Sequence, residues 1–125
     1  MHEFSIARAM VEAACSEARR VGSDRVTRVV CRIGSLRQVD DRLMREAFDI
    51  ARNGTACATA ELTIERTNME AACPRCRVRF AVRDWDWDCP TCGMLGEDAA
   101  GGDELELISL DAEVPDERAG AAECV

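Results

Sequence analysis

The spacing of apolar residues predicts a helix followed by a strand in the first third of the chain. Apolar side chains recur three or four positions apart over residues 4–21, which is the pattern of an amphipathic helix. They are Phe4, Ala7, Met10, Val11, Ala14, Ala18 and Val21. β-branched residues then dominate 26–33, where Val29, Cys31 and Ile33 share one face. We therefore expect a helix over 4–21 and a strand over 26–33, with Cys31 in the core.

Helical and strand patterns continue to alternate as far as residue 114. Asp40 or Asp41 is expected to cap a second helix that ends near Arg52. The apolar stripe of this helix consists of Leu43, Met44, Ala47, Phe48 and Ala51. Three later segments have strand character, namely 60–66, 80–82 and 104–114. Gly, Ala and Asp predict a loop at 96–103, and we expect residues 115–125 to form a disordered acidic tail.

This order of elements predicts an α+β fold with two helices and roughly three strands, into which a cysteine-rich module is inserted. The last strand is expected to return and pair with one of the first two. The predicted boundaries place the α+β domain at residues 1–68 plus 104–114 and the inserted module at residues 69–103.

Charge and composition exclude several classes of function. The chain has 125 residues, and its 24 acidic against 16 basic side chains give a net charge of −8, which would repel a nucleic-acid backbone. Lysine is absent, which rules out Schiff-base chemistry. No segment has the ~18–20 consecutive apolar residues of a membrane span, and there is no signal-peptide pattern. We expect a cytoplasmic protein with no nucleic-acid or membrane partner.

The histidine content argues against an enzyme. The only histidine is His2, at the second position of the chain. A Ser-His-Asp or Cys-His relay needs an imidazole that is held rigidly, and a chain terminus is a poor place for one. We therefore expect a binding protein that catalyses no reaction.

Four of the eight cysteines form two Cys-x-x-Cys pairs with twelve residues between them. The four are Cys73, Cys76, Cys89 and Cys92. This is the spacing of a zinc ribbon, in which each pair supplies two thiolates to a tetrahedral ion. Gly93 follows the second pair and supplies a permissive backbone, whereas Arg77 follows the first. We expect a closed, structural Zn(II) site, in preference to a catalytic zinc or a redox dithiol.

Other residues of the chain have a less specific interpretation. The remaining cysteines lie singly and are not expected to bind zinc: Cys15, Cys31, Cys57 and Cys124. Trp85 and Trp87 lie just before the second cysteine pair. They either cover the small core of the module or bind a partner, and the first role is favoured.

The N-terminal residues Met1, His2 and Glu3 have the donor groups of a chelator. The Met1 amine and the His2 backbone nitrogen close a five-membered ring on a metal, and that nitrogen and His2 Nδ1 close a six-membered ring. Nitrogen donors in this planar arrangement suit Ni(II) or Cu(II). Glu3 would add its backbone nitrogen or its carboxylate. A histidine near a terminus commonly has no ligand role, so the residues alone leave both interpretations open.

Taken in order, the motifs of residues 1–114 resemble the HypA/HybF family of hydrogenase nickel-incorporation proteins. The matching motifs are Met1-His2-Glu3, residues 33–36, Ala47-Phe48, residues 53–55, residues 62–64, the two cysteine pairs with Gly93, and residues 104–107. The paired cysteines alone occur in many protein families. The order of all these motifs along the chain, with a histidine at position 2, is specific to this family.

The resemblance implies a nickel metallochaperone. By this analogy Met1, His2 and Glu3 bind Ni(II), the four paired cysteines hold structural Zn(II), and the partners are a nickel-insertion GTPase and the large subunit of [NiFe] hydrogenase, with urease served as well in some members. The chain would act as a monomer or a homodimer. The alternative interpretation is a zinc-ribbon adaptor in transcription or translation, for which His2 would be incidental. Net charge and the N-terminal triplet argue against it.

Overall fold

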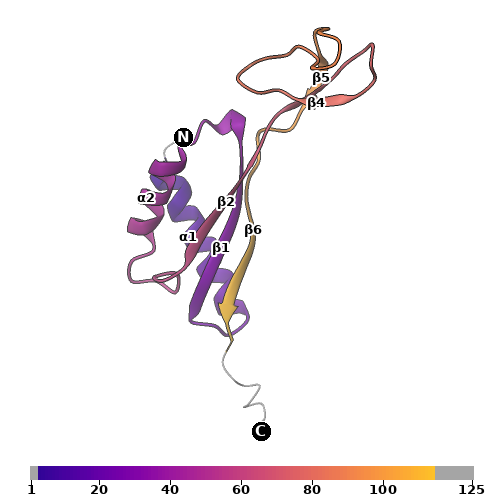
Figure 1. Ribbon diagram of the computed structural model, residues 1–125. Helices are drawn as coiled ribbons and strands as arrows, with labels where there is room; N and C mark the ends of the chain where they lie inside the picture. Colours follow the sequence, from indigo (N-terminus) through magenta and orange to yellow (C-terminus); the bar gives the residue numbers. More distant parts are fainter. Residues whose placement is uncertain (1–2, 115–125) are drawn as a thin grey trace. The chain divides into compact units, whose positions relative to one another are not determined.

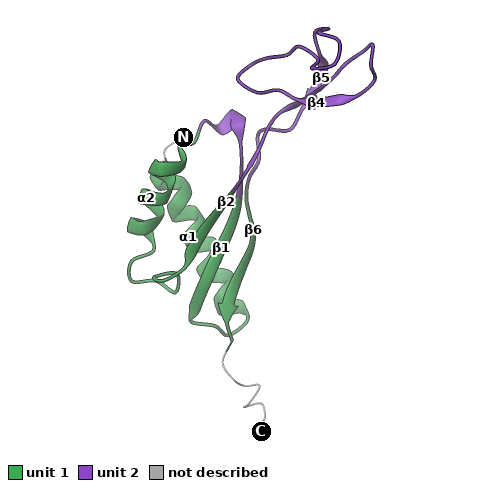
Figure 2. Ribbon diagram, viewed as in Figure 1, with its two compact units in different colours: residues 1–31, 39–64, 106–125 green, residues 32–38, 65–105 purple. Residues whose placement is uncertain are grey.

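The computed structural model describes residues 3–114, which form two compact units (Figure 1, Figure 2). The helices are α1 (Glu3–Arg20), the short 3₁₀ helix η1 (Ser35–Arg37) and α2 (Asp41–Ala51). The strands are β1 (Arg25–Gly34), β2 (Glu61–Thr67), β3 (Glu70–Ala72), β4 (Arg79–Ala81), β5 (Glu97–Ala100) and β6 (Leu105–Glu113). The predicted α+β class is confirmed. The predicted tail at 115–125 and the residues Met1 and His2 lie outside the described part of the chain.

Unit 1, within the described residues, consists of 3–31, 39–64 and 106–114. Its core is built from the helical stripes and one face of β1, as the apolar spacing predicted. The fully buried members from α1 and β1 include Ala7, Ala14, Ala18, Val26, Val29 and Cys31. Cys31 has no exposed surface, which confirms its packing role. Helices α1 and α2 pack against each other, and α2 adds Met44 and Phe48 to the core.

Three residues that the helical stripes placed in the core are exposed instead. Phe4 is 46% exposed, Val21 46% and Leu43 45%. Phe4 lies in the first turn of α1, and Val21 lies just beyond the end of this helix. Leu43 lies in the first turn of α2, beside the Asp40 cap, whose side chain accepts a hydrogen bond from the Leu43 backbone N–H at 2.9 Å. The helix ends therefore carry the exposed members of each stripe.

The larger sheet has the strand order β2-β1-β6, so the last strand does return to an earlier one, as predicted. As residue numbers decrease along β1, the numbers of the hydrogen-bonded residues in and next to β6 increase. Gly34 N–H donates to Glu104 O at 2.8 Å, while Thr27 Oγ1 donates to Asp111 O at 3.2 Å. β1 and β6 are therefore antiparallel.

Unit 2 consists of residues 32–38 and 65–105 and contains a second sheet, of order β4-β3-β5. β3 pairs antiparallel with both neighbours: Ala71 lies opposite Phe80 in β4, and Glu70 lies opposite Ala100 in β5. The prediction of a loop throughout 96–103 was wrong, because Glu97–Ala100 forms β5. All four residues of β5 are exposed, so the strand has no apolar alternation and depends on backbone pairing with β3.

Gly34 lies where two backbone segments of unit 2 approach each other closely. A Cβ at this position would lie 2.2 Å from both the carbonyl carbon and the carbonyl oxygen of Gly102. The neighbouring Leu36 N–H donates to Gly102 O at 2.7 Å, so the backbone cannot separate without losing this hydrogen bond.

We expect Gly34→Ala to lower the free energy of unfolding by about 3 kcal/mol, at the upper end of the cost of overpacking. The control is Gly54→Ala, where a Cβ meets nothing within 4 Å and only the φ of +73° is unfavourable. That change is expected to cost about 1 kcal/mol. Urea unfolding of the two variants compares them directly, and equal costs would contradict the close approach at Gly34.

Candidate metal centre

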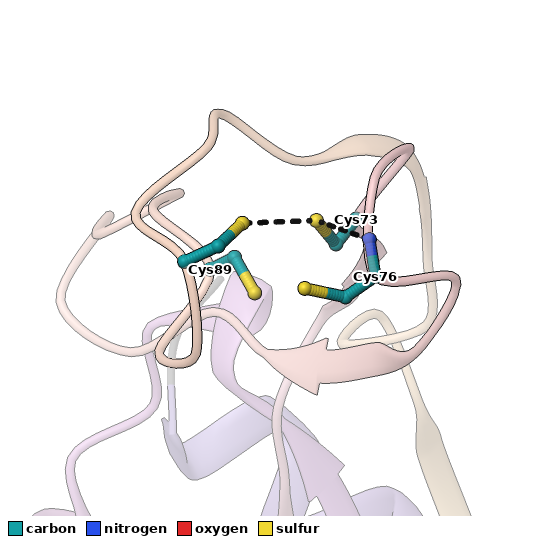
Figure 3. A group of neighbouring side chains, drawn as sticks. Cys73, Cys76 and Cys89 are labelled. Atoms are coloured by element: carbon teal, nitrogen blue, oxygen red, sulfur yellow. Dashed lines mark hydrogen bonds between the residues drawn. The ribbon is translucent and has the colours of Figure 1, made fainter.

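The four paired cysteines meet in one cluster within unit 2 (Figure 3). Their sulfur atoms all lie within 4.8 Å of one another, and Cys73 Sγ lies 3.5 Å from Cys92 Sγ. Cys73 and Cys89 are almost fully buried, while Cys76 and Cys92 are partly exposed. The structure therefore brings together the complete set of cysteines that the spacing singled out.

Each cysteine pair has the same backbone geometry. In the first, Arg77 N–H donates to Cys73 O at 2.9 Å and Cys73 N–H donates to Val78 O at 2.9 Å. The second pair repeats both hydrogen bonds at 2.8 Å, from Gly93 to Cys89 O and from Cys89 to Met94 O. The residue after each pair has a positive φ, 61° at Arg77 and 79° at Gly93. Arg77 thus adopts the left-handed conformation that glycine supplies in the second turn.

Backbone N–H groups of the two turns point at the sulfur atoms. Cys76 N–H donates to Cys73 Sγ at 3.2 Å, and Thr91 N–H donates to Cys89 Sγ at 3.4 Å. Donation from the backbone N–H of Cys92, and less from that of Thr91, lowers the pKa of Cys89 to about 7. A hydrogen bond with Cys92, followed by desolvation, raises the pKa of Cys76 to about 12. Four thiols this close cannot all ionise readily unless a cation compensates their charge.

The donor set and its spacing fit a tetrahedral zinc ion. With Zn–S distances of about 2.3 Å, the sulfur atoms of such a site lie roughly 3.8 Å apart. In the structure one pair of sulfur atoms is 3.5 Å apart and no pair is more than 4.8 Å apart, so the cluster has a size that fits such a site. Four protein sulfurs complete the coordination, so this arrangement suits a structural ion rather than a catalytic one.

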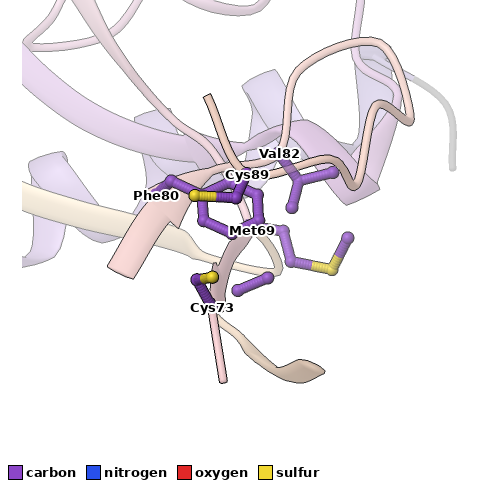
Figure 4. Close-up of a cluster of buried hydrophobic side chains, with 6 residues drawn as sticks. Met69, Cys73, Phe80, Val82 and Cys89 are labelled. Atoms are coloured by element: carbon purple, nitrogen blue, oxygen red, sulfur yellow. The ribbon is translucent and has the colours of Figure 1, made fainter. Parts of the chain in front are cut away.

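The apolar core that supports this cluster is small (Figure 4). Its buried members are Met69, Ala71, Cys73, Phe80, Val82 and Cys89, so two of the six are themselves metal-ligand candidates. A Cβ at Gly96 would lie 2.6 Å from the Phe80 ring, which shows how closely the backbone covers this core. With so little apolar surface buried, a metal ion would supply much of the folding free energy of unit 2.

The two tryptophans have different environments. Trp87 is half-buried and packs against the small apolar core that contains Cys73 and Cys89. It therefore covers this core, which is the role that we favoured for both tryptophans. Trp85 is 66% exposed and has a φ of 61°, next to Asp84 with a φ of 54°. Asp86 N–H donates to Arg83 O at 2.9 Å, which closes this tight turn. The covering role is therefore wrong for Trp85, which the turn presents to solvent.

The predicted N-terminal metal site is only partly within the described residues. Met1 and His2 lie outside them, and Glu3 is the first residue of α1. Glu3 Oε2 accepts a hydrogen bond from Asp40 N–H at 3.1 Å, at the start of α2. Asp40 or Asp41 was predicted as the helix cap, and Asp40 is the cap in the structure. Nothing in the local pattern indicated the contact of Asp40 with Glu3, which lies 37 positions away.

The single cysteines within the described chain lie apart from the four-sulfur cluster. Cys31 is buried in β1, and Cys15 of α1 lies near Cys57 in unit 1. Cys124 lies outside the described residues. No helix among residues 3–114 has the length and apolar character required to cross a membrane.

Comparison with known proteins identifies the family. The family model described as "Hydrogenase/urease nickel incorporation, metallochaperone, hypA" matches residues 1–112. A curated relative, the hydrogenase maturation factor HypA of Wolinella succinogenes, is 33% identical over 118 residues, which are 94% of this chain and 99% of that protein. The HypA of Chloroflexus aurantiacus strain J-10-fl is 38% identical over 112 residues, covering 89% and 98% of the two chains.

Solved structures of the same family share this fold. The solution structure of the Ni metallochaperone HypA from Helicobacter pylori matches with a TM-score of 0.60 and 29% identity, covering 91% of this chain and 99% of that one. A second solution structure of a HypA protein matches with a TM-score of 0.63 and 27% identity, covering 90% and 97%. The chain described here therefore belongs to the HypA family of hydrogenase maturation factors.

Proposed function

We propose that this protein is a nickel metallochaperone, which binds Ni(II) through its N-terminal residues and delivers it during the maturation of [NiFe] hydrogenase. The observation that carries the proposal is the family match over residues 1–112, because it includes Met1-His2-Glu3 together with the four-cysteine cluster. Nickel is the cargo in this account, and zinc is a resident structural ion on Cys73, Cys76, Cys89 and Cys92. The chain itself catalyses no reaction.

The nickel site consists of the Met1 amine, the His2 backbone nitrogen and His2 Nδ1, with Glu3 as a further ligand. The carboxylate of Glu3 already accepts a hydrogen bond from Asp40 N–H. This arrangement favours the backbone nitrogen of Glu3 over its carboxylate as the ligand.

The two metals have sites that suit different tasks. Cys73 and Cys89 are 1% and 2% exposed, so zinc on the cluster would exchange slowly. Nickel on the N-terminal donors would instead be passed on by stepwise ligand exchange. In this scheme the α+β domain of residues 1–68 and 104–114 carries nickel, and the module of residues 69–103 carries zinc.

The proposed recipients are a nickel-insertion GTPase and the large subunit of [NiFe] hydrogenase in the cytoplasm, with urease as an alternative destination. Family membership favours this function over a zinc-ribbon adaptor, for which His2 would be incidental. The net charge of −8 also disfavours an adaptor that contacts nucleic acid.

A calorimetric titration with Ni(II) at several pH values tests the proposal. The amine and the imidazole must both lose their protons to coordinate, and they protonate at roughly pH 8 and pH 6.5 respectively. Both deprotonated forms disappear as the pH falls, so nickel affinity should decrease from alkaline to acid pH and binding should release protons. An affinity that stays constant between pH 8 and pH 5.5 would show that neither nitrogen is a ligand.

A further inference from the structure

Two cysteines of unit 1 that no metal site uses lie in contact with each other. Cys15 Sγ, on α1, lies 3.9 Å from Cys57 Sγ, in the turn region that connects α2 to β2. The two residues are 42 positions apart in the sequence, so their contact is a product of the fold. A disulfide needs its sulfur atoms about 2.05 Å apart. The two sulfur atoms must therefore move closer together before they can bond.

The two thiols differ in their access to solvent. Cys57 is fully buried, whereas Cys15 is partly exposed. Cys15 also lines an open groove of about 520 Å³, together with Val11, Glu12, Arg19, Ser23, Asp24 and residues 54–56. A small oxidant in solution therefore has access to Cys15 from this groove, whereas Cys57 has no exposed surface.

Cys57 is also held in a fixed place. Its backbone N–H donates to Thr55 Oγ1 at 3.0 Å, and its carbonyl accepts from Ala60 N–H at 2.9 Å. The adjacent carbonyl of Ala56 accepts from Val26 N–H of β1 at 2.8 Å. These bonds fix the backbone of the turn that carries Cys57.

We propose that Cys15 and Cys57 form an oxidisable thiol pair, which a hydroperoxide converts into an intramolecular disulfide. In the first step the Cys15 sulfur attacks hydrogen peroxide, the O–O bond breaks, and Cys15 sulfenic acid and one water are formed. In the second step the Cys57 sulfur attacks the Cys15 sulfur, the S–O bond breaks, and the Cys57 proton leaves with the hydroxide as a second water. The two thiols are oxidised and the peroxide is reduced.

The order of these steps follows from the surroundings of each thiol. Desolvation by burial, with a smaller effect from Cys15, raises the pKa of Cys57 to about 12. The thiolate is the form that reacts with peroxide, so Cys57 is a poor first target. Cys57 is the resolving thiol because the Cys15 sulfenic acid forms next to it, at a position where the two sulfur atoms lie 3.9 Å apart in the reduced protein. The disulfide would join α1 to the turn after α2 and remove conformational freedom from the unfolded chain, so it should stabilise unit 1.

The test is peroxide treatment of the zinc-loaded full chain, followed by mass spectrometry of the intact protein and of its peptides. We expect a loss of about 2 Da per disulfide, a linked peptide that contains Cys15 and Cys57, and full reversal by a reducing agent. The matched control Cys31→Ala removes another buried thiol of unit 1 and should behave as the unaltered chain does, because the proposed disulfide does not include Cys31. Peptides with the zinc cysteines are followed in the same map, which separates their oxidation from that of the pair.

Two variants test the order of events. In Cys57→Ala, Cys15 should stop at the sulfenic acid and be trapped by dimedone, and alanine avoids placing a hydroxyl in the buried site. In Cys15→Ala, Cys57 should remain a thiol under the same treatment. The proposal is overturned if the unaltered chain yields Cys15 sulfinic acid beside a free Cys57 thiol, or if Cys57 is oxidised in the absence of Cys15. Neither result depends on nickel binding.

Discussion

Replacing Cys73 with serine is expected to release zinc and to unfold unit 2. Cys73 is 1% exposed, it lies 3.5 Å from Cys92 Sγ, and it belongs to both the ligand set and the small apolar core. Loss of one thiolate opens the coordination, and the remaining apolar contacts are too few to hold β3, β4 and β5 together. Because metal binding is folding energy in a module of this size, the cost should be several kcal/mol.

Zinc content by atomic absorption and backbone signals by NMR measure the two parts of this prediction. Signals of residues 69–103 should collapse into the range of unfolded peptides, while signals of α1 and α2 persist. The matched control is Cys15→Ser, which changes a cysteine on α1 away from the cluster and should leave zinc content unchanged. A Cys73→Ser protein that keeps a full equivalent of tightly bound zinc would show that the ligand set is wrong.

Local patterns predicted most of unit 1 because its elements are amphipathic. The stripe containing Ala7, Ala14 and Ala18 and the alternation that places Val29 and Cys31 on one face show which faces are buried. The pattern is less informative at the helix ends, where Phe4 and Leu43 continue the spacing but remain nearly half exposed. Burial at an end depends on what packs there, and spacing along one helix does not contain that information.

The second sheet was harder to predict, for a physical reason. β5 is exposed along its whole length and β3 has only three residues, so neither shows a period of two in its apolar side chains. Their pairing is made through the backbone, which leaves no periodic signal in the side chains. The cluster itself was predictable, because two Cys-x-x-Cys pairs at this separation are typical of a four-thiolate metal site.

The contact between Glu3 and Asp40 shows a further limit of the sequence. Glu3 was identified as a nickel ligand with two alternative donor atoms, and the chain alone offered no way to choose between them. The hydrogen bond from Asp40 N–H engages the carboxylate in the fold. On this basis we expect Glu3→Gln, which keeps an acceptor oxygen, to have a smaller effect on nickel affinity than loss of the imidazole.

The second large effect is expected at the N-terminal chelate. His2→Ala removes the imidazole and with it the six-membered chelate ring. Only the five-membered ring between the Met1 amine and the backbone nitrogen of residue 2 remains. Loss of a residue that merely supports a ligand already costs roughly 10–100-fold in metal affinity, so loss of a ligand should cost more. Zinc content should not change, because the four-sulfur cluster involves neither His2 nor the amine.

The most direct test of the central claim is the nickel affinity of two zinc-loaded proteins that differ only at the N-terminus. One begins with a free amine at Met1, and the other carries a short Gly-Ser extension that converts this amine into an amide. The extension leaves every side chain in place but breaks the five-membered ring, so we expect nickel affinity to fall by more than about 100-fold, with zinc retained. Equal affinity and an identical nickel absorption spectrum in the two proteins would contradict the proposed site.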